Sequence, residues 1–127
     1  MVAGLEIAST ERSGCCVMTV SGEVEVAHTR RLQVALAQHM RVETPLVLDL
    51  TGVQFMDSAG LYVVLRMHHE FRQAGLRLVA VPSPAVMRVF EIAGVQHFLP
   101  TCPSVADALA VLSAEVTQAQ TMPASET

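Results

Sequence analysis

The adjacent residues Asp57 and Ser58 carry the clearest chemical potential in this sequence, because they open an amphipathic helix directly after a loop. Ser58 falls at the predicted N-cap, where a hydroxyl commonly accepts a hydrogen bond from a free backbone N–H group. The same place suits a phosphate, because a helix N-terminus offers unpaired N–H groups and positive potential. Ser58 is therefore either a structural cap or the acceptor of a phosphoryl group.

Phosphorylation of Ser58 would have a clearer effect on partner binding than on the stability of the fold. It would add about −1.5 to −2 charges at this position. Asp57 would repel that charge, so the net effect on stability has no obvious sign. A partner that fits a small hydroxyl would meet a bulky dianion instead. Gly60 leaves the first helical turn without a side chain, which permits close approach by another backbone.

Catalytic chemistry is not predicted for Ser58. A hydrolase nucleophile elbow has the pattern Gly-x-Ser-x-Gly on a sharp strand-to-helix turn. Gly60 is present here, but Met56 occupies the earlier glycine position. The adjacent His68 and His69 point to different helix faces and lack the HExxH pattern of a zinc protease. We therefore predict that the chain is not an enzyme and needs neither a metal nor another cofactor.

Composition narrows the class of protein. The chain has 127 residues, which fits one domain, and 51% of them are apolar, which argues against disorder. Its eight basic residues are scattered arginines and its net charge is −4, so direct nucleic-acid binding is not expected. Every apolar run is broken before it could cross a membrane. The N-terminal ten residues lack the basic start of a secretory signal.

The cysteines point to a reducing compartment. Cys15 and Cys16 are adjacent and Cys102 is remote, so no CxxC spacing exists. Small buried thiols in a reduced chain explain this pattern better than a disulfide framework or a zinc site. We therefore expect a cytoplasmic protein.

Hydrophobic periodicity predicts alternating strands and helices along the chain. The predicted strands lie around residues 5–7, 15–20, 46–50 and 76–81, and the predicted helices around 30–40, 58–75, 84–94 and 105–112. The first two strands could form a hairpin, and helical crossovers imply parallel pairing for the others. The fold class is thus α/β, one domain with a small mixed β-sheet and about four α-helices.

The helix ends carry recognisable signals. Ser83 followed by Pro84 predicts a capped helix start, and the segment from Ser104 to Asp107 resembles a capping box. Gly75 and Gly94 fit left-handed positions that close helices.

The loop predicted over residues 51–57 carries three apolar side chains. Val53 and Phe55 are predicted to pin it to the core. Met56 could pack under the loop or remain exposed and contact a partner. On the following helix, His68 is predicted to be half-buried and His69 solvated.

Three segments in order resemble the signature of the STAS domain family, which is named for sulfate transporters and anti-sigma-factor antagonists. They are Ser21-Gly22-Glu23-Val24-Glu25, Val53-x-Phe55-Met56-Asp57-Ser58-Ala59-Gly60-Leu61 and Ser83-Pro84-Ala85-Val86-x-Arg88-Val89-Phe90-x-x-Ala93-Gly94. The resemblance covers roughly residues 3–113. We accordingly assign residues 1–113 to a STAS domain and residues 114–127 to a flexible C-terminal tail.

Within this family the chain most resembles bacterial anti-sigma-factor antagonists, and the resemblance implies partner switching. The unphosphorylated antagonist would bind an anti-sigma factor, a serine kinase of the histidine-kinase-like ATPase fold, and so free a sigma factor for transcription. Phosphorylation of Ser58 would release the kinase, and a metal-dependent serine phosphatase would reverse the modification.

The resemblance also assigns partner-binding residues. They are Gly22, Glu23, Glu25, Met56, Asp57, Ser58, Ala59 and Gly60. Glu25 departs from the pattern, because the family usually has Asp there and the glutamate side chain reaches about one methylene further. Glu23 keeps the family residue type.

A second hypothesis is a scaffold or accessory subunit that uses the same fold without phosphorylation, in a signalling assembly or a lipid-transport complex. The intact run from Asp57 to Gly60 favours the phosphorylated antagonist, since a scaffold has no need of that serine. The sequence leaves the oligomeric state open, although an exposed edge strand could support a homodimer.

Overall fold

The computed structural model describes residues 4–121 of the chain, and the side chains of residues 4–115. Its first two strands, β1 (Leu5–Arg12) and β2 (Cys15–Val24), form an antiparallel hairpin. The turn between them places Ser13 at φ 55° and Gly14 at φ 78°. Positive φ at both central residues matches the twist of two paired strands, so the predicted hairpin is confirmed.

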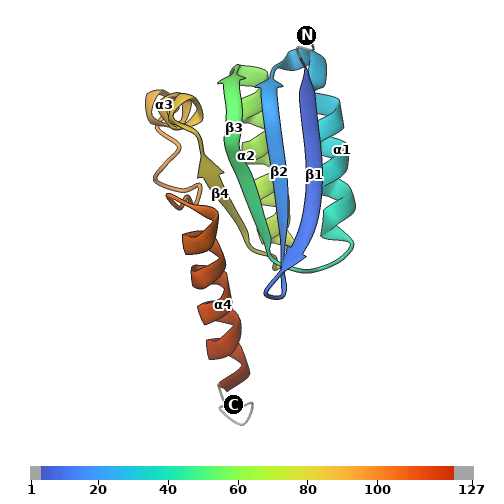
Figure 1. Cartoon of the computed structure of the whole chain (residues 1–127), viewed down its shortest axis with the longest axis vertical. Helices are drawn as coiled ribbons and strands as arrows, with labels where there is room; N and C mark the ends of the chain where they lie inside the picture. The colour runs from blue at the N-terminus through green and yellow to red at the C-terminus, as the bar shows by residue number, and fades with distance from the viewer. Residues whose placement is uncertain (1–3, 122–127) are drawn as a thin grey trace.

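Parallel pairing extends this hairpin into a four-stranded mixed sheet. β3 (Leu46–Met56) pairs with β2, and β4 (Leu78–Pro82) pairs with β3, which gives the order β1-β2-β3-β4. The chain reaches each parallel strand through a helix: α1 (Thr29–Met40) precedes β3 and α2 (Ser58–Gln73) precedes β4. Figure 1 shows these two helices side by side behind the sheet.

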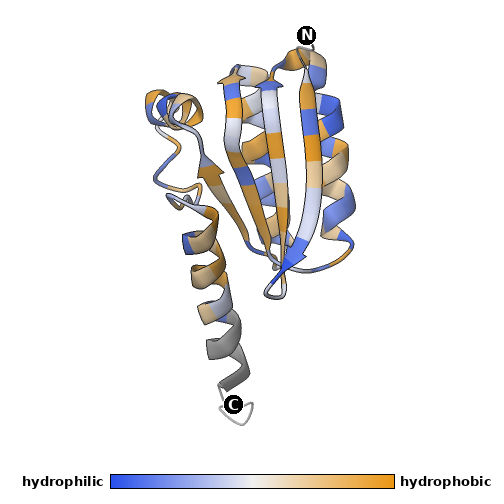
Figure 2. Ribbon diagram, viewed as in Figure 1, coloured by the Kyte–Doolittle hydropathy of each residue, from blue (hydrophilic) through white to orange (hydrophobic). Residues whose placement is uncertain are grey.

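Two apolar clusters hold the layers together. The larger cluster lies between the sheet and helices α1, α2 and α3 (Pro84–Ala93), and it includes the fully buried Phe71 and Phe90. The smaller cluster lies on the opposite face, where Ala108, Leu109 and Leu112 of α4 (Val105–Thr121) cover the cysteine end of β2 and parts of β3 and β4. In Figure 2, β4 is coloured mostly hydrophobic, whereas the end of β1 is coloured hydrophilic. The helix α4 does not reach that end of β1.

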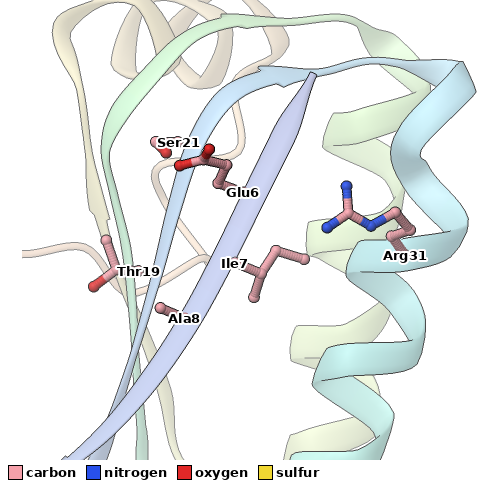
Figure 3. Close-up of a pocket in the computed structure, with 6 residues that line it drawn as sticks. All are labelled: Glu6, Ile7, Ala8, Thr19, Ser21 and Arg31. Carbon is pink, nitrogen blue, oxygen red and sulfur yellow. The ribbon is translucent and has the colours of Figure 1, made fainter. Parts of the chain in front are cut away.

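The part of the sheet beyond α4 is polar and open. In Figure 3, Glu6, Ala8 and Thr19 lie on this uncovered face, whereas Ile7 points toward α1. On the α1 side, Arg31 Nη1 donates a hydrogen bond to the Leu5 carbonyl oxygen at 2.6 Å and so ties the helix to the edge strand.

The predicted fold class is confirmed, but β3 is longer than expected. The segment predicted as a loop over residues 51–57 continues β3 as far as Met56, because β2 also extends and pairs with it as far as Val24. Register shifts after Thr19 and after Gly22 accommodate this pairing. Val53 is buried as expected. The prediction for Phe55 was wrong, because its side chain is 50% exposed.

The predicted starts of α3 and α4 and the two closing glycines are confirmed. Ser83 Oγ accepts a hydrogen bond from the Val86 N–H at 3.1 Å, and Ser104 Oγ accepts one from the Asp107 N–H at 3.0 Å. Gly75 and Gly94 have φ values of 76° and 72°. α4 extends to Thr121, and residues 122–127 lie outside the described residues, so the flexible tail stays a prediction.

Two further observations bear on the expectations from sequence. His68 is only 6% exposed and therefore more deeply buried than predicted, while His69 is exposed as predicted. Within residues 4–121, no helix has the length and apolar character needed to cross a membrane.

Candidate functional site

Three segments of the chain meet at one end of the sheet, near the N-terminus in Figure 1. They are the end of β2 with the short helix η1 (Val26–His28), the end of β3, and the first turn of α2. Because β2 and β3 are parallel, their C-terminal ends lie together, and α2 starts directly after β3. We call this surface, residues 22–28 and 54–62, the Ser58 rim.

Asp57, and not Ser58, is the N-cap of α2, so the predicted cap position was wrong by one residue. Asp57 Oδ1 accepts a hydrogen bond from the Gly60 N–H at 2.8 Å, and Oδ2 accepts one from the Val26 N–H at 3.0 Å. The Asp57 N–H donates to the Val24 carbonyl oxygen at 3.1 Å. The two carboxylate oxygens of Asp57 thus join the helix start to η1, and its backbone N–H joins it to the end of β2.

Ser58 is consequently the first residue of α2, with an exposed side chain. Its hydroxyl makes no hydrogen bond to any residue that the structure describes. Asp57 satisfies the Gly60 N–H, which leaves the N–H groups of Ser58 and Ala59 as the free donors of the first turn. The Ser58 oxygen is therefore accessible, unpartnered and close to positive helix-end potential.

Gly60 is required by the packing of the chain itself. A Cβ atom at Gly60 would lie 2.4 Å from the Val24 carbonyl oxygen and 2.7 Å from Val24 Cγ1. The backbone that approaches this glycine is thus the end of β2. Met56 is 4% exposed and packs into the core, so it is not an exposed partner contact.

The glycine and the two glutamates of the first motif occupy the neighbouring part of the rim. Gly22 has φ 103°, and a Cβ there would lie 1.9 Å from the Gly4 carbonyl oxygen, so only glycine fits. Glu23 Oε1 is buried without a hydrogen-bond partner among the described residues. Glu25 Oε2 lies 3.9 Å from His28 Nδ1, and both side chains are partly exposed.

Exposed apolar side chains of the rim were missed by the sequence interpretation. Val26 is 70%, Phe55 50% and Tyr62 61% exposed. Val26 is bonded through its N–H to Asp57, and Tyr62 lies one helical turn after Ser58, on the same face of α2. These three are the exposed large apolar side chains of the Ser58 rim, and exposed apolar patches are typical of protein–protein contacts. Tyr62, the single tyrosine, could have been found from its i+4 spacing to Ser58.

Comparison with known proteins shows the family to which this chain belongs. The sequence profile of the STAS domain matches residues 6–108, a range that contains the whole Ser58 rim. The chain belongs to the STAS domain family. The anti-sigma F factor antagonist of Paenibacillus polymyxa is 31% identical over 112 residues, which cover 85% of this chain and 95% of that protein.

Solved structures support the same STAS fold. The crystal structure of an anti-sigma factor antagonist from Mycobacterium paratuberculosis superposes with a TM-score of 0.76 and 27% identity, covering 86% of this chain and 94% of that one. The anti-sigma factor antagonist SpoIIAA in its unphosphorylated form superposes with a TM-score of 0.68 at 17% identity, over 86% of this chain and 97% of SpoIIAA, which shows the shared fold.

Proposed function

We propose that this STAS protein is an anti-sigma-factor antagonist whose binding is switched by phosphorylation of Ser58. In the unphosphorylated form, the Ser58 rim binds an anti-sigma factor that is a serine kinase of the histidine-kinase-like ATPase fold. That binding frees a sigma factor in the cytoplasm. Phosphorylation by the same kinase releases the antagonist, and a serine phosphatase restores it.

The observation that carries the proposal is the exposed, unpartnered Ser58 hydroxyl. Because Asp57 caps α2, the adjacent serine has no structural task in the described part of the chain. A phosphoryl group on Ser58 can stay on the surface, since no buried contact of the oxygen must be broken. The name of the Paenibacillus polymyxa relative supports the same role.

The apolar rim supplies a docking surface around that hydroxyl. Phe55 and Tyr62 offer large aromatic groups, which are common anchors of protein interfaces. Glu23 and Glu25 add negative charge beside them, which favours a partner with basic residues at the contact. A phosphate at Ser58 would stand between these groups and the partner.

One charged group can account for the loss of kinase affinity that the switch requires. A thousandfold loss of affinity corresponds to about 4 kcal/mol. Repulsion and desolvation of a dianion enclosed in an interface can supply this amount. The switch therefore needs no large change of shape in the antagonist.

Affinity capture from native host lysate with added ADP tests the proposal directly. The baits are the wild type, Ser58→Ala, Ser58→Asp and Ser104→Asp, with bound proteins identified by mass spectrometry. Ser104 caps α4 far from the rim, and aspartate caps as well as serine, so Ser104→Asp controls for the added charge.

We expect the wild type, Ser58→Ala and Ser104→Asp to retain a histidine-kinase-like ATPase, and Ser58→Asp to lose it. If all four baits retain the same proteins and none is such a kinase, the partner-switch proposal fails. The non-phosphorylated scaffold would then be the better description.

A second pair of variants tests the docking surface. Tyr62→Ser removes an exposed aromatic group from the rim, and Val111→Ser removes an exposed apolar group from α4. The affinity of each variant for the captured kinase is then measured. We expect Tyr62→Ser to weaken binding at least tenfold and Val111→Ser to leave it unchanged. Equal affinities of the two variants would place the interface elsewhere.

The local character of the switch can be read from amide NMR spectra. Phosphorylation by the captured kinase is expected to move signals of the Ser58 rim and leave those of β1, β4 and α4 in place. Widespread changes across the sheet would show a global rearrangement instead.

A further inference from the structure

A small pocket lies at the end of the molecule opposite the Ser58 rim, where α2 finishes and β4 begins. It has a volume of about 310 Å³, and its wall includes His68, Arg72, Arg77 and Phe98. Among residues 4–115, whose side chains are described, no acidic side chain belongs to this wall. The pocket wall therefore combines three basic side chains with the apolar residues Leu76, Leu78, Phe98 and Pro100, in a chain whose net charge is −4.

The basic groups of the pocket are close enough to influence one another. Burial lowers the pKa of the His68 imidazole. The positive charges of Arg72, Arg77 and His69 lower that pKa further. His68 is thus a neutral ring held beside two guanidinium groups.

The His68 side chain is mostly buried, but its ring reaches the pocket wall. It is 6% exposed, and it makes no hydrogen bond with the described residues. Neither ring nitrogen is among the fully buried polar atoms that lack a partner, so the ring is open to the pocket that it lines and a bound group could hydrogen-bond to it there.

The outer edge of β4 adds a backbone donor. The Ala80 N–H donates to the Pro100 carbonyl oxygen, and the Ala80 carbonyl accepts from the Cys102 N–H, so both groups of Ala80 face outward. Backbone groups along a strand repeat their direction every two residues. The N–H of Leu78 therefore also faces the outer edge, where Leu78 lines the pocket.

We propose that this pocket, formed by His68, Arg72 and Arg77 at the β4 edge, binds a phosphate group. Two guanidinium forks, an imidazole and a backbone N–H are the donors that phosphate oxygens prefer. The phosphate is either inorganic phosphate or the headgroup of a small phosphorylated metabolite, whose organic part would lie against the 57% exposed Phe98. This site is independent of Ser58 and of its phosphorylation.

Two negative charges near the pocket oppose the binding of phosphate, and one of them can be removed by substitution. The C-terminal end of α2 carries about half a negative charge. Glu115 of α4 also holds Arg77, with Oε2 2.5 Å from Arg77 Nη1. A phosphate must share Arg77 with Glu115, so removal of the Glu115 charge should strengthen binding.

The experiment is an NMR titration of the full chain at pH 7.5 and constant ionic strength, with the His68 ring protons as the readout. The probes are inorganic phosphate and phenyl phosphate, and sodium chloride is the reference. The variants are Arg72→Gln, Arg77→Gln and Glu115→Gln. Arg66→Gln is the matched control, because Arg66 lies exposed on the same helix and pairs with Glu70.

We expect saturable binding of phosphate, weakened at least tenfold by Arg72→Gln or Arg77→Gln, strengthened by Glu115→Gln and unchanged by Arg66→Gln. Tighter binding of phenyl phosphate would identify a phosphorylated metabolite as the ligand class, and equal affinities would identify inorganic phosphate. Signals that do not saturate, or an equal loss in Arg66→Gln, would overturn the proposal.

A second readout separates a bound phosphate from general screening. A phosphate beside His68 stabilises the imidazolium and must raise the pKa of the ring, against the opposing charges of Arg72 and His69 on α2 and Arg77 before β4. An unchanged His68 pKa at saturating phosphate would contradict direct contact, even if other signals move.

Discussion

The starts of α2 and α3 use the same residue type in opposite ways. At α3, Ser83 is the N-cap and is 4% exposed; its hydroxyl accepts from the Val86 N–H and donates to the Val53 carbonyl oxygen at 2.7 Å. At α2, Asp57 takes the capping bonds, and Ser58 stands outside them with an exposed hydroxyl. A serine at a helix start is therefore either a cap itself or, where the preceding residue caps the helix, an exposed hydroxyl that can be modified.

The largest expected difference between the two starts is in stability. Ser83→Ala leaves the Val53 carbonyl and the Val86 N–H without a partner in a buried place, so we expect a loss of about 2–4 kcal/mol of unfolding free energy. Urea denaturation followed by circular dichroism measures it. Ser104→Ala, which removes a more exposed cap with a single bond, is the control and should cost much less. Equal losses would show that burial of Ser83 adds nothing.

Gly60 and Val86 hold equivalent third positions in their helices, and a Cβ atom at Gly60 would lie 2.4 Å from the Val24 carbonyl oxygen. Gly60→Ala should therefore destabilise the protein by about 1–3 kcal/mol through overpacking against Val24. A gain in stability, as helix propensity alone would give, would show that the end of β2 can move away.

The Asp57 cap has a smaller expected effect, because water can reach part of its surroundings. Asp57→Ala should cost about 1–2 kcal/mol, since the N–H groups of Val26 and Gly60 both lose their acceptor. Asp57→Asn keeps one acceptor oxygen and should lose less. Identical stability of the two variants in thermal denaturation would show that only the charge matters.

Ser58→Ala is expected to change the unfolding free energy by less than about 0.5 kcal/mol, because the hydroxyl makes no hydrogen bond among the described residues. The same substitution should abolish phosphorylation by the captured kinase, as measured by intact mass. A loss of stability comparable to that of Ser83→Ala would make Ser58 structural and remove the contrast between the two helix starts.

The sequence predicted the layers of the fold and most helix ends because those signals are local. Ser83 with Pro84, and Gly75 and Gly94, each impose a geometry on their own backbone. The cap of α2 was predicted one residue too late, at Ser58, because both Asp57 and Ser58 are good caps and the choice depends on a hydrogen bond to the Val26 N–H of η1.

The extension of β3 could not be predicted for a similar reason. Thr51 and Gly52 interrupt the apolar run, and pairing continues because the register between β2 and β3 shifts twice, each time with one extra residue in β3. This irregular pairing breaks the alternation of faces, which is why Phe55 is exposed and Met56 is buried.

The separate apolar cluster beneath α4 has a consequence for the way the molecule opens. Ala108, Leu109 and Leu112 pack on the sheet face opposite α1 and α2, so α4 can detach without disturbing the larger cluster. We expect backbone amides of α4 to exchange with deuterium through a local opening, much faster than those of α2. The end of the sheet that carries Ser58 would then keep its geometry while the C-terminal helix samples open states.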